Sequence, residues 1–278
     1  MRKALLALMV LLSLVSPVAA DNEGSVYDRV MKTGVIRCGY TTWMPFFMKD
    51  PNTGKFSGIW YDVMQEVGKA LDVKIEWSEE VSLANYITAL EHNRIDMYCS
   101  DEWPTATRGK HVEYTSPIAY LAVGAVVRAE DRRFDNAFEK IDAPDVTVTT
   151  IEGDMSAIIA KKNFPRAKLL ELPALSDISM ALNNVASGKA DVTFVDRLTA
   201  AIFMKNNLGK IRFVPAERPL RLFGDVLAAK LGEHKFVTMV DTALVELVQS
   251  GAVDDIIDRY EEVPGTFYRV AKPYVLPR

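Results

Sequence analysis

The sequence predicts an α/β protein of two lobes, each built around a mainly parallel sheet, with two extended crossings between the lobes. Short apolar runs alternate with helical apolar spacing from Val35 to Cys99, which is typical of strand–helix–strand units. The alternation stops in the extended apolar stretch 114–127 and restarts at Val146. A second extended run, 221–229, interrupts it again. These three observations separate two α/β units.

The individual elements follow from apolar spacing and from the turn residues between them. In the first unit we expect strands at 35–38, 73–77 and 95–99, with helices around 63–71 and 86–90. In the second unit we expect strands at 146–150, 168–172 and 192–195, with helices at 155–164, 178–187 and 197–207. After the second crossing we expect closing helices at 235–250 and 253–260, which return to the first lobe, and an extended strap at 263–278.

The two crossings, near 118–124 and 219–226, set the predicted lobe boundaries. We expect residues 21–120 and 224–278 to form the first lobe. Residues 121–223 then form the second lobe.

The first twenty residues have the layout of a secretory signal peptide. Arg2 and Lys3 precede an apolar run, and small residues precede a cleavage site after Ala20. A membrane anchor is the alternative, but the run is shorter than the roughly 20 residues that a spanning helix needs. We therefore expect residues 1–20 to be removed and the mature protein to be periplasmic. The full sequence has a net charge of −4, and the mature protein, which lacks Arg2 and Lys3, is more negative by two charges.

The two cysteines, Cys38 and Cys99, leave two alternatives open. In an exported protein a disulfide between them is chemically allowed. Each cysteine also lies near the end of an apolar run, where a free thiol packs as a small hydrophobic side chain.

The composition excludes several classes of function. Acidic and basic residues are interspersed, and the net charge is slightly negative, so neither nucleic acid nor a polybasic membrane contact is expected. The three histidines are scattered without metal-ligand spacing, and no phosphate-loop or nucleophile motif occurs. We therefore expect no metal and no cofactor.

Several short motifs occur in an order and spacing that together identify a family. They are Gly34 to Gly39, Trp43 to Phe46, Gly54 to Gly58, Leu90 to Asp96, Thr105 to Arg108, Tyr114 to Pro117 and Ser187 to Asp196. On these motifs the chain resembles the family 3 extracellular solute-binding proteins, the periplasmic receptors of polar amino-acid ABC importers. The resemblance runs from about residue 30 to residue 260. It implies the two-lobed type II periplasmic-binding-protein fold.

The resemblance also implies a function and partners. We expect a monomeric receptor that captures a small carboxylate-bearing ligand, an amino acid or a compound like one, between two closing lobes. The receptor then delivers the ligand to the membrane subunits of an ABC importer.

Two charged residues carry the implied ligand contacts. Arg108 matches the family position that binds the ligand carboxylate, a task suited to the planar guanidinium group. Asp196 matches the position that binds the ligand ammonium from the facing lobe. Each has a structural alternative: Arg108 as a surface residue at a helix start, and Asp196 as the N-cap of the helix that begins at Arg197.

Neighbouring positions complete the implied site. Trp43 matches an aromatic position that stacks on the ligand, with core packing as its alternative. Ser100 and Thr105 are expected hydrogen-bond donors.

The sequence departs from the family pattern at two places. Asp101, Glu102 and Trp103 stand where relatives carry small hydroxyl residues, and Gly153, Asp154 and Met155 stand where relatives have Gly-Thr-Thr. We therefore expect Asp101, Trp103, Gly153 and Met155 at the site, with Asp101 and Trp103 favouring a ligand that carries extra positive charge.

An enzyme on the same fold is the alternative function. Periplasmic cyclohexadienyl dehydratases resemble the same family, and the stretch 142–147 is similar to theirs. Such an enzyme needs a general acid in the cleft, a role open to Asp101 or Glu102. We expect a binding protein and not an enzyme.

Overall fold

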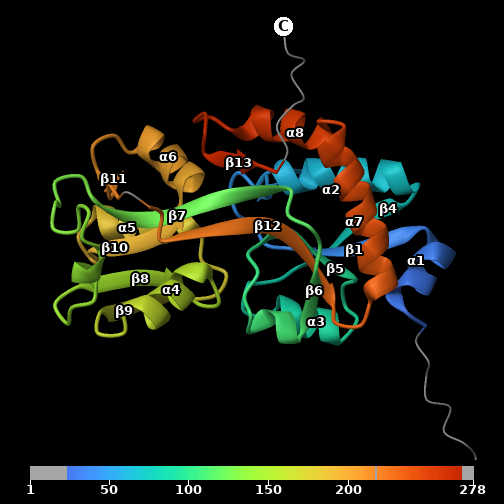
Figure 1. The fold of residues 1–278 in the computed structure, drawn as a ribbon, viewed down its shortest axis with the longest axis horizontal. Coiled ribbons are helices and arrows are strands. Elements are labelled where there is room, and N and C mark those ends of the chain that lie inside the picture. Colours follow the sequence, from blue (N-terminus) through green and yellow to red (C-terminus); the bar gives the residue numbers. More distant parts are fainter. Residues whose placement is uncertain (1–23, 217, 271–278) are drawn as a thin grey trace, which may run out of the picture.

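The computed structural model describes residues 24–216 and 218–270, which form two lobes side by side (Figure 1). The predicted signal peptide and residues 271–278 of the predicted strap lie outside the described residues.

The first lobe is built on β1 (Val35–Tyr40), which pairs in parallel with β4 (Lys74–Glu80) and with β5 (Met97–Glu102). Its other elements before the first crossing are helices that cover the sheet and short strands at its margins. They are α1 (Val26–Thr33), β2 (Met48–Lys49), β3 (Phe56–Ser57), α2 (Ile59–Leu71), α3 (Tyr86–Glu91), the 3₁₀ turn η1 (Arg108–Lys110) and β6 (Val112–Tyr114).

The second lobe has a parallel core of the same kind. In it, β8 (Thr147–Ile151) pairs in parallel with β9 (Lys168–Leu172) and with β10 (Val192–Asp196). The remaining elements of this lobe are η2 (Phe138–Ile141), α4 (Met155–Asn163), α5 (Ile178–Ala186), α6 (Arg197–Asn206) and β11 (Ile211–Phe213).

Two long antiparallel strands connect the lobes. β7 (Ala119–Arg128) and β12 (Arg221–Lys230) pair from Arg221 opposite Val123 to Asp225 opposite Ala119, and Figure 1 shows both running from one lobe to the other. The expected parallel cores therefore belong to one mixed sheet, in the order β4-β1-β5-β12-β7-β10-β8-β9. The predicted lobe boundaries fall inside β7 and β12, and we propose them as the limits of the lobes.

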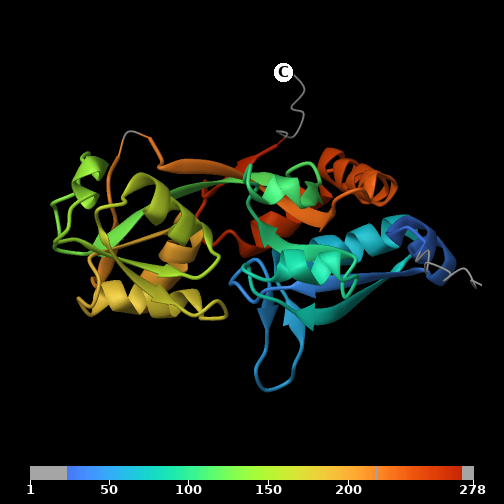
Figure 2. The same cartoon turned by 90° about the horizontal axis from the view of Figure 1, so that it is seen from below.

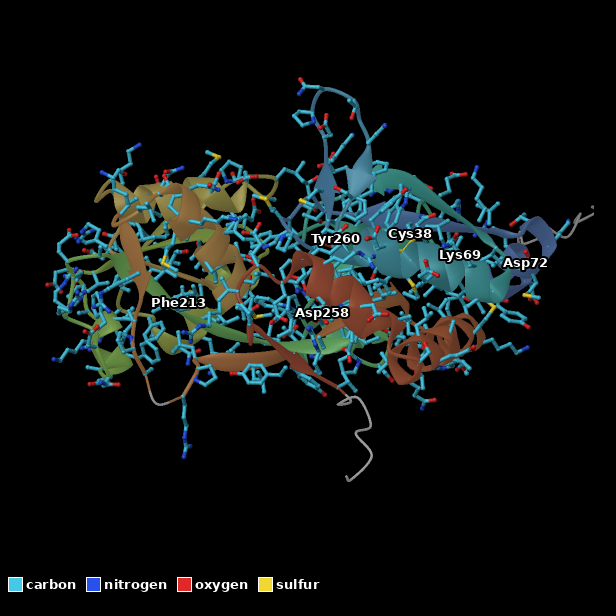
Figure 3. The ribbon with its side chains drawn as sticks, turned by 90° about the horizontal axis from the view of Figure 1, so that it is seen from above. Cys38, Lys69, Asp72, Phe213, Asp258 and Tyr260 are labelled. Atoms are coloured by element: carbon cyan, nitrogen blue, oxygen red, sulfur yellow. A yellow bond between two sulfur atoms is a disulfide. The ribbon has the colours of Figure 1, made fainter. Side chains whose placement is uncertain are left out.

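The C-terminal helices return to the first lobe, as predicted. α7 (His234–Gln249) and α8 (Ala252–Tyr260) pack against α2. The Tyr260 hydroxyl donates a hydrogen bond to Asp62 Oδ2 at 2.9 Å and accepts one from the Gly58 amide at 3.2 Å; Figure 3 shows Tyr260 at the end of α8 that faces the second lobe. β13 (Phe267–Arg269), within the predicted strap, pairs antiparallel with β7.

Among the described residues, no single helix has the length and apolar composition to cross a membrane. Taken together, α7 and α8 reach that length and composition, but they meet at an angle of 76°.

Several elements were missed from the sequence, and two of them are informative. α1 begins at its cap Ser25, whose hydroxyl accepts from the Asp28 amide, and it ends at Gly34 in the left-handed conformation. Both are ordinary helix-end signals that apolar spacing alone does not reveal. The second is the β2–β3 hairpin, which projects from the first lobe in Figure 2.

The two cysteines form a disulfide between neighbouring strands. Cys38 of β1 and Cys99 of β5 are both fully buried, and the bond joins residues 61 positions apart. In Figure 3 Cys38 lies in the first lobe, whereas Phe213 of β11 lies in the second. Of the two alternatives that the sequence left open, the structure contains the disulfide.

Removing this disulfide is expected to lower the free energy of unfolding by about 2–4 kcal/mol, because the bond restricts a long loop in the unfolded chain. The double variant Cys38→Ala/Cys99→Ala, measured by urea unfolding, tests this. Reduced wild-type protein is the control, because it lacks the disulfide but keeps both cysteine side chains. Equal midpoints for oxidised wild type, reduced wild type and the variant would contradict the expectation.

Candidate ligand-binding site

A cavity lies where the two lobes meet. Most of its lining comes from the first lobe, and Asp154 and Met155 come from the second. The lining residues are Thr41, Trp43, Leu83, Tyr98, Ser100, Asp101, Glu102, Trp103, Arg108, Asp154 and Met155. The space left at its centre is about 20 Å³, room for about one water molecule. A larger ligand therefore enters only when the lobes move apart.

Arg108 lies at the wall of this cavity with its charge already paired. Its Nη1 donates to Glu102 Oε1 at 2.7 Å, and both side chains are buried. Its Nη2 donates across the cleft to the carbonyl oxygen of Gly153 at 2.5 Å. The guanidinium also lies 5.6 Å from the ring centre of Tyr86. The predicted carboxylate-binding group is thus held by a carboxylate of its own chain.

Glu102 is the other half of this buried pair. Burial raises the pKa of Glu102 to about 7, although the charge of Arg108 lowers it. Only one of its oxygens is paired within the described part of the chain, because Oε2 has no hydrogen-bond partner of good geometry there. Tyr86 lies nearby and lowers the same pKa, but its hydroxyl is outside hydrogen-bond geometry. Glu102 therefore has a buried acceptor left over.

Three aspartates, here called the central carboxylates, gather beside the cavity: Asp101, Asp196 and Asp225. Asp225 and Asp196 are fully buried. Trp60 Nε1 donates to Asp225 Oδ1 at 2.9 Å, and the Thr199 amide donates to Asp196 Oδ1 at 2.8 Å. Among the described residues, no group donates a hydrogen bond to Asp225 Oδ2, Asp196 Oδ2 or Asp101 Oδ1, but the carboxyl groups of Asp101 and Asp225 lie close enough to share a proton in a hydrogen bond.

The central carboxylates hold protons more tightly than exposed aspartates do. Burial raises the pKa of Asp101 well above its ordinary range, and the neighbouring charge of Asp225 raises it further. Burial also raises the pKa of Asp225 to about 7, and the charge of Asp196 contributes. Carboxylates buried together without a cation are costly in their ionised form. A positively charged ligand group would relieve this cost.

Close contacts across the cleft show that the lobes are closed. The Trp43 Nε1 of the first lobe donates to Thr199 Oγ1 of α6 at 3.4 Å. Gly153 has a positive φ of +79°, and a Cβ at this position would lie 2.6 Å from the amide nitrogen of Ala84. Only glycine permits this approach of the two lobes.

The structure brings six of the predicted site residues together at the cavity: Trp43, Ser100, Asp101, Trp103, Arg108 and Met155. The other three lie outside the lining. Thr105 Oγ1 accepts from the Arg108 amide at 3.2 Å, so it holds the backbone just before the turn that begins at Arg108. Asp196 caps α6, and Gly153 lies at the contact between the lobes.

The residue most clearly missed from the sequence is Asp225. It stands alone among apolar residues in the second crossing, and a lone carboxylate in such a run signals a buried polar site. Glu102 was named only as an alternative acid, and its pairing with Arg108 was not foreseen. Asp154 is the N-cap of α4, where its side chain accepts from the Ser156 amide.

Asp225 gives the protein a pH-dependent stability. Its folded-state pKa is raised, so the folded protein binds a proton that the unfolded chain has already lost. The free energy of unfolding therefore falls as pH rises from about 5 through about 7. Asp225→Asn keeps an oxygen for the Trp60 hydrogen bond and removes this titration.

We expect the decrease between pH 5 and pH 8 to be smaller in Asp225→Asn than in wild type by roughly 1–3 kcal/mol. Urea unfolding of ligand-free protein across this range measures it. The exposed Asp145→Asn is the matched control and should follow wild type. Parallel pH profiles for wild type and Asp225→Asn would show that Asp225 titrates normally.

Comparison with known proteins places this arrangement in a family. Relatives include the L-cystine-binding protein TcyA of Bacillus subtilis (strain 168), 25% identical and covering 94% of this chain and 97% of the relative. The cyclohexadienyl dehydratase of Pseudomonas aeruginosa is 25% identical and covers 69% of this chain and 70% of that enzyme. The ancestral amino acid-binding protein AncCDT-1, described as a precursor of cyclohexadienyl dehydratase, has 26% identity and a TM-score of 0.75, covering 85% of this chain and 99% of its own.

The family model described as bacterial extracellular solute-binding proteins, family 3, matches residues 36–263. This span includes β1 to α8, the crossing strands and every residue of the cavity. The chain belongs to family 3 of the bacterial extracellular solute-binding proteins.

Proposed function

We propose that this protein is a receptor that captures a small amino-acid-like solute with a net positive charge between its lobes. The observation that carries the proposal is the cluster of buried carboxylate oxygens beside the cavity, on Asp101, Asp196 and Asp225, to which no described residue of basic or neutral type donates a hydrogen bond. Such oxygens need a donor, and a cationic group both donates hydrogen bonds and balances the charge. The six cavity-lining residues predicted from the sequence form the walls of this site.

Capture depends on closure of the lobes. β7 and β12 connect the lobes, so bending of these strands would open the cleft, as in other hinged binding proteins. The ligand ammonium then lies between carboxylates of β5 and β12 in the first lobe and the end of β10 in the second.

Delivery and location follow from the family. Its members are extracellular components of ABC transporters, so the mature chain acts outside the cytoplasm. We propose that a monomer presents the loaded ligand to the membrane subunits of an ABC importer, after cleavage behind Ala20.

A relative supports the positive charge of the ligand. AncCDT-1 is also described as an ancestral cationic amino acid solute binding protein, with 26% identity and a TM-score of 0.65. Both this similarity and the buried carboxylates beside the cavity therefore support a ligand that carries a positive charge.

Ligand binding is tested by calorimetry on protein that has been unfolded, dialysed and refolded to remove bound solute. We expect binding of at least one amine from a panel of amino acids and amines. Asp101→Asn is expected to weaken it at least about tenfold, since one partner of a buried charge pair is lost. Asp145→Asn is the control. Preference for neutral or acidic amino acids, unaffected by Asp101→Asn, would contradict the proposal.

An enzyme remains a second candidate because buried carboxyl groups with raised pKa values lie beside the cavity and one relative is a cyclohexadienyl dehydratase. A protonated carboxyl group could protonate the leaving hydroxyl while carbon dioxide departs. We expect no consumption of prephenate or arogenate by the purified protein, followed by chromatography. Turnover that disappears in Glu102→Gln or Asp101→Asn would establish the enzyme instead.

A further inference from the structure

The pairing of Arg108 bears on which solutes this site can take. In the closed protein the guanidinium donates to Glu102, to the Gly153 carbonyl and, more weakly at 3.4 Å, to the carbonyl of Leu83. Both charged partners are almost inaccessible, with side-chain exposures of 10% for Arg108 and 0% for Glu102. When Glu102 is ionised, the pair is therefore electrically balanced before any ligand arrives.

A ligand carboxylate at Arg108 would meet this balanced pair. It would bring a second negative charge next to Glu102, whose Oε2 already lacks a partner. Two buried anions that share one cation are unfavourable, because the Coulomb gain of a single guanidinium must offset the desolvation of both. The Glu102 carboxylate already forms the ion pair with Arg108 that a ligand carboxylate would need.

The rest of the cavity wall favours cations. Among its lining residues Arg108 is the one basic side chain, whereas Asp101, Glu102 and Asp154 are acidic. Trp43, Tyr98 and Trp103 also line it, and aromatic faces attract ammonium groups. Every charged or aromatic group on this wall except Arg108 thus favours an amine.

We propose that Glu102 is a specificity-determining residue that neutralises Arg108 and makes the site select amines without a carboxylate over the corresponding α-amino acids. This inference rests on the proposed function and specifies its ligand class. Diamines and related decarboxylated amines fit it, with one ammonium at the central carboxylates and the other near Glu102 Oε2.

Matched ligand pairs test the inference on the wild-type protein. Lysine and cadaverine differ only by the carboxylate group, and so do arginine and agmatine. Calorimetry on refolded, ligand-free protein should show that each amine binds at least about tenfold more tightly than its amino acid. Tighter binding of lysine and arginine than of their amines would overturn the inference.

Glu102→Gln tests the assigned residue. The amide keeps an oxygen for Arg108 and removes the negative charge, so the guanidinium becomes available to a ligand carboxylate. The ratio of amine to amino-acid affinity should fall at least about tenfold within each pair. Glu246→Gln, an exposed change on α7, should leave the ratio at the wild-type value. A general loss of folding would weaken both members of a pair equally, and the wild-type pairs decide the question if the variant does not fold.

The outcomes separate this inference from the proposed function. An unchanged ratio in folded Glu102→Gln overturns the role of Glu102. Binding of lysine and arginine in preference to their amines removes the inference and leaves an ammonium-binding receptor. Binding of neutral or acidic amino acids alone removes both.

Discussion

The antiparallel pairing of β7 with β12 is the constraint on which the rest of the structure depends. It joins two parallel cores into one sheet and brings the end of β5 next to β12, with Val226 opposite Glu102. Asp225 stands on β12 within this crossing, paired with Ala119 of β7. The strands that connect the lobes therefore also supply a carboxylate of the site. Asp225 thus lies beside the cavity on one of the two strands that connect the lobes.

The proposed ligand class depends on the charge balance of the cavity. One side of the site holds a paired cation and anion, Arg108 and Glu102, and the other side holds Asp101 and Asp225 with raised pKa values. Without ligand, protons on these aspartates limit the buried negative charge. A cationic ligand can replace those protons, so capture should release them and tighten as pH rises toward neutrality. Arg108, which the family resemblance led us to expect as the group that binds a ligand carboxylate, is already paired with Glu102.

Much of the fold could be predicted from the sequence because it depends on local patterns. The strand predicted at 168–172 has those limits in the structure, and the helices of the second lobe differ from the predictions by about one residue at their ends. Apolar spacing and the crossings were sufficient for this. α1 was missed because its evidence is a cap at Ser25 and a stop at Gly34, not a long apolar face.

The site was only partly predictable because its charges meet over long sequence distances. Six of nine predicted residues line the cavity, because the resemblance indicated which positions of the chain to consider, including those where this sequence departs from the family. The contact between Asp101 and Asp225 arises from the pairing of β5 with β12, which no local pattern reports. Neighbouring Asp101 and Glu102 also have different partners, and the sequence does not say which of them faces Arg108.

The most direct measurement is mass spectrometry of the small molecules released when the protein, purified without refolding, is denatured. A receptor that selects amines without a carboxylate should release a stoichiometric amine with no carboxyl group, and this amine should be absent from a parallel preparation of Asp101→Asn. Recovery of an α-amino acid in stoichiometric amount would contradict this selectivity, because a ligand carboxylate would then share the cleft with Glu102.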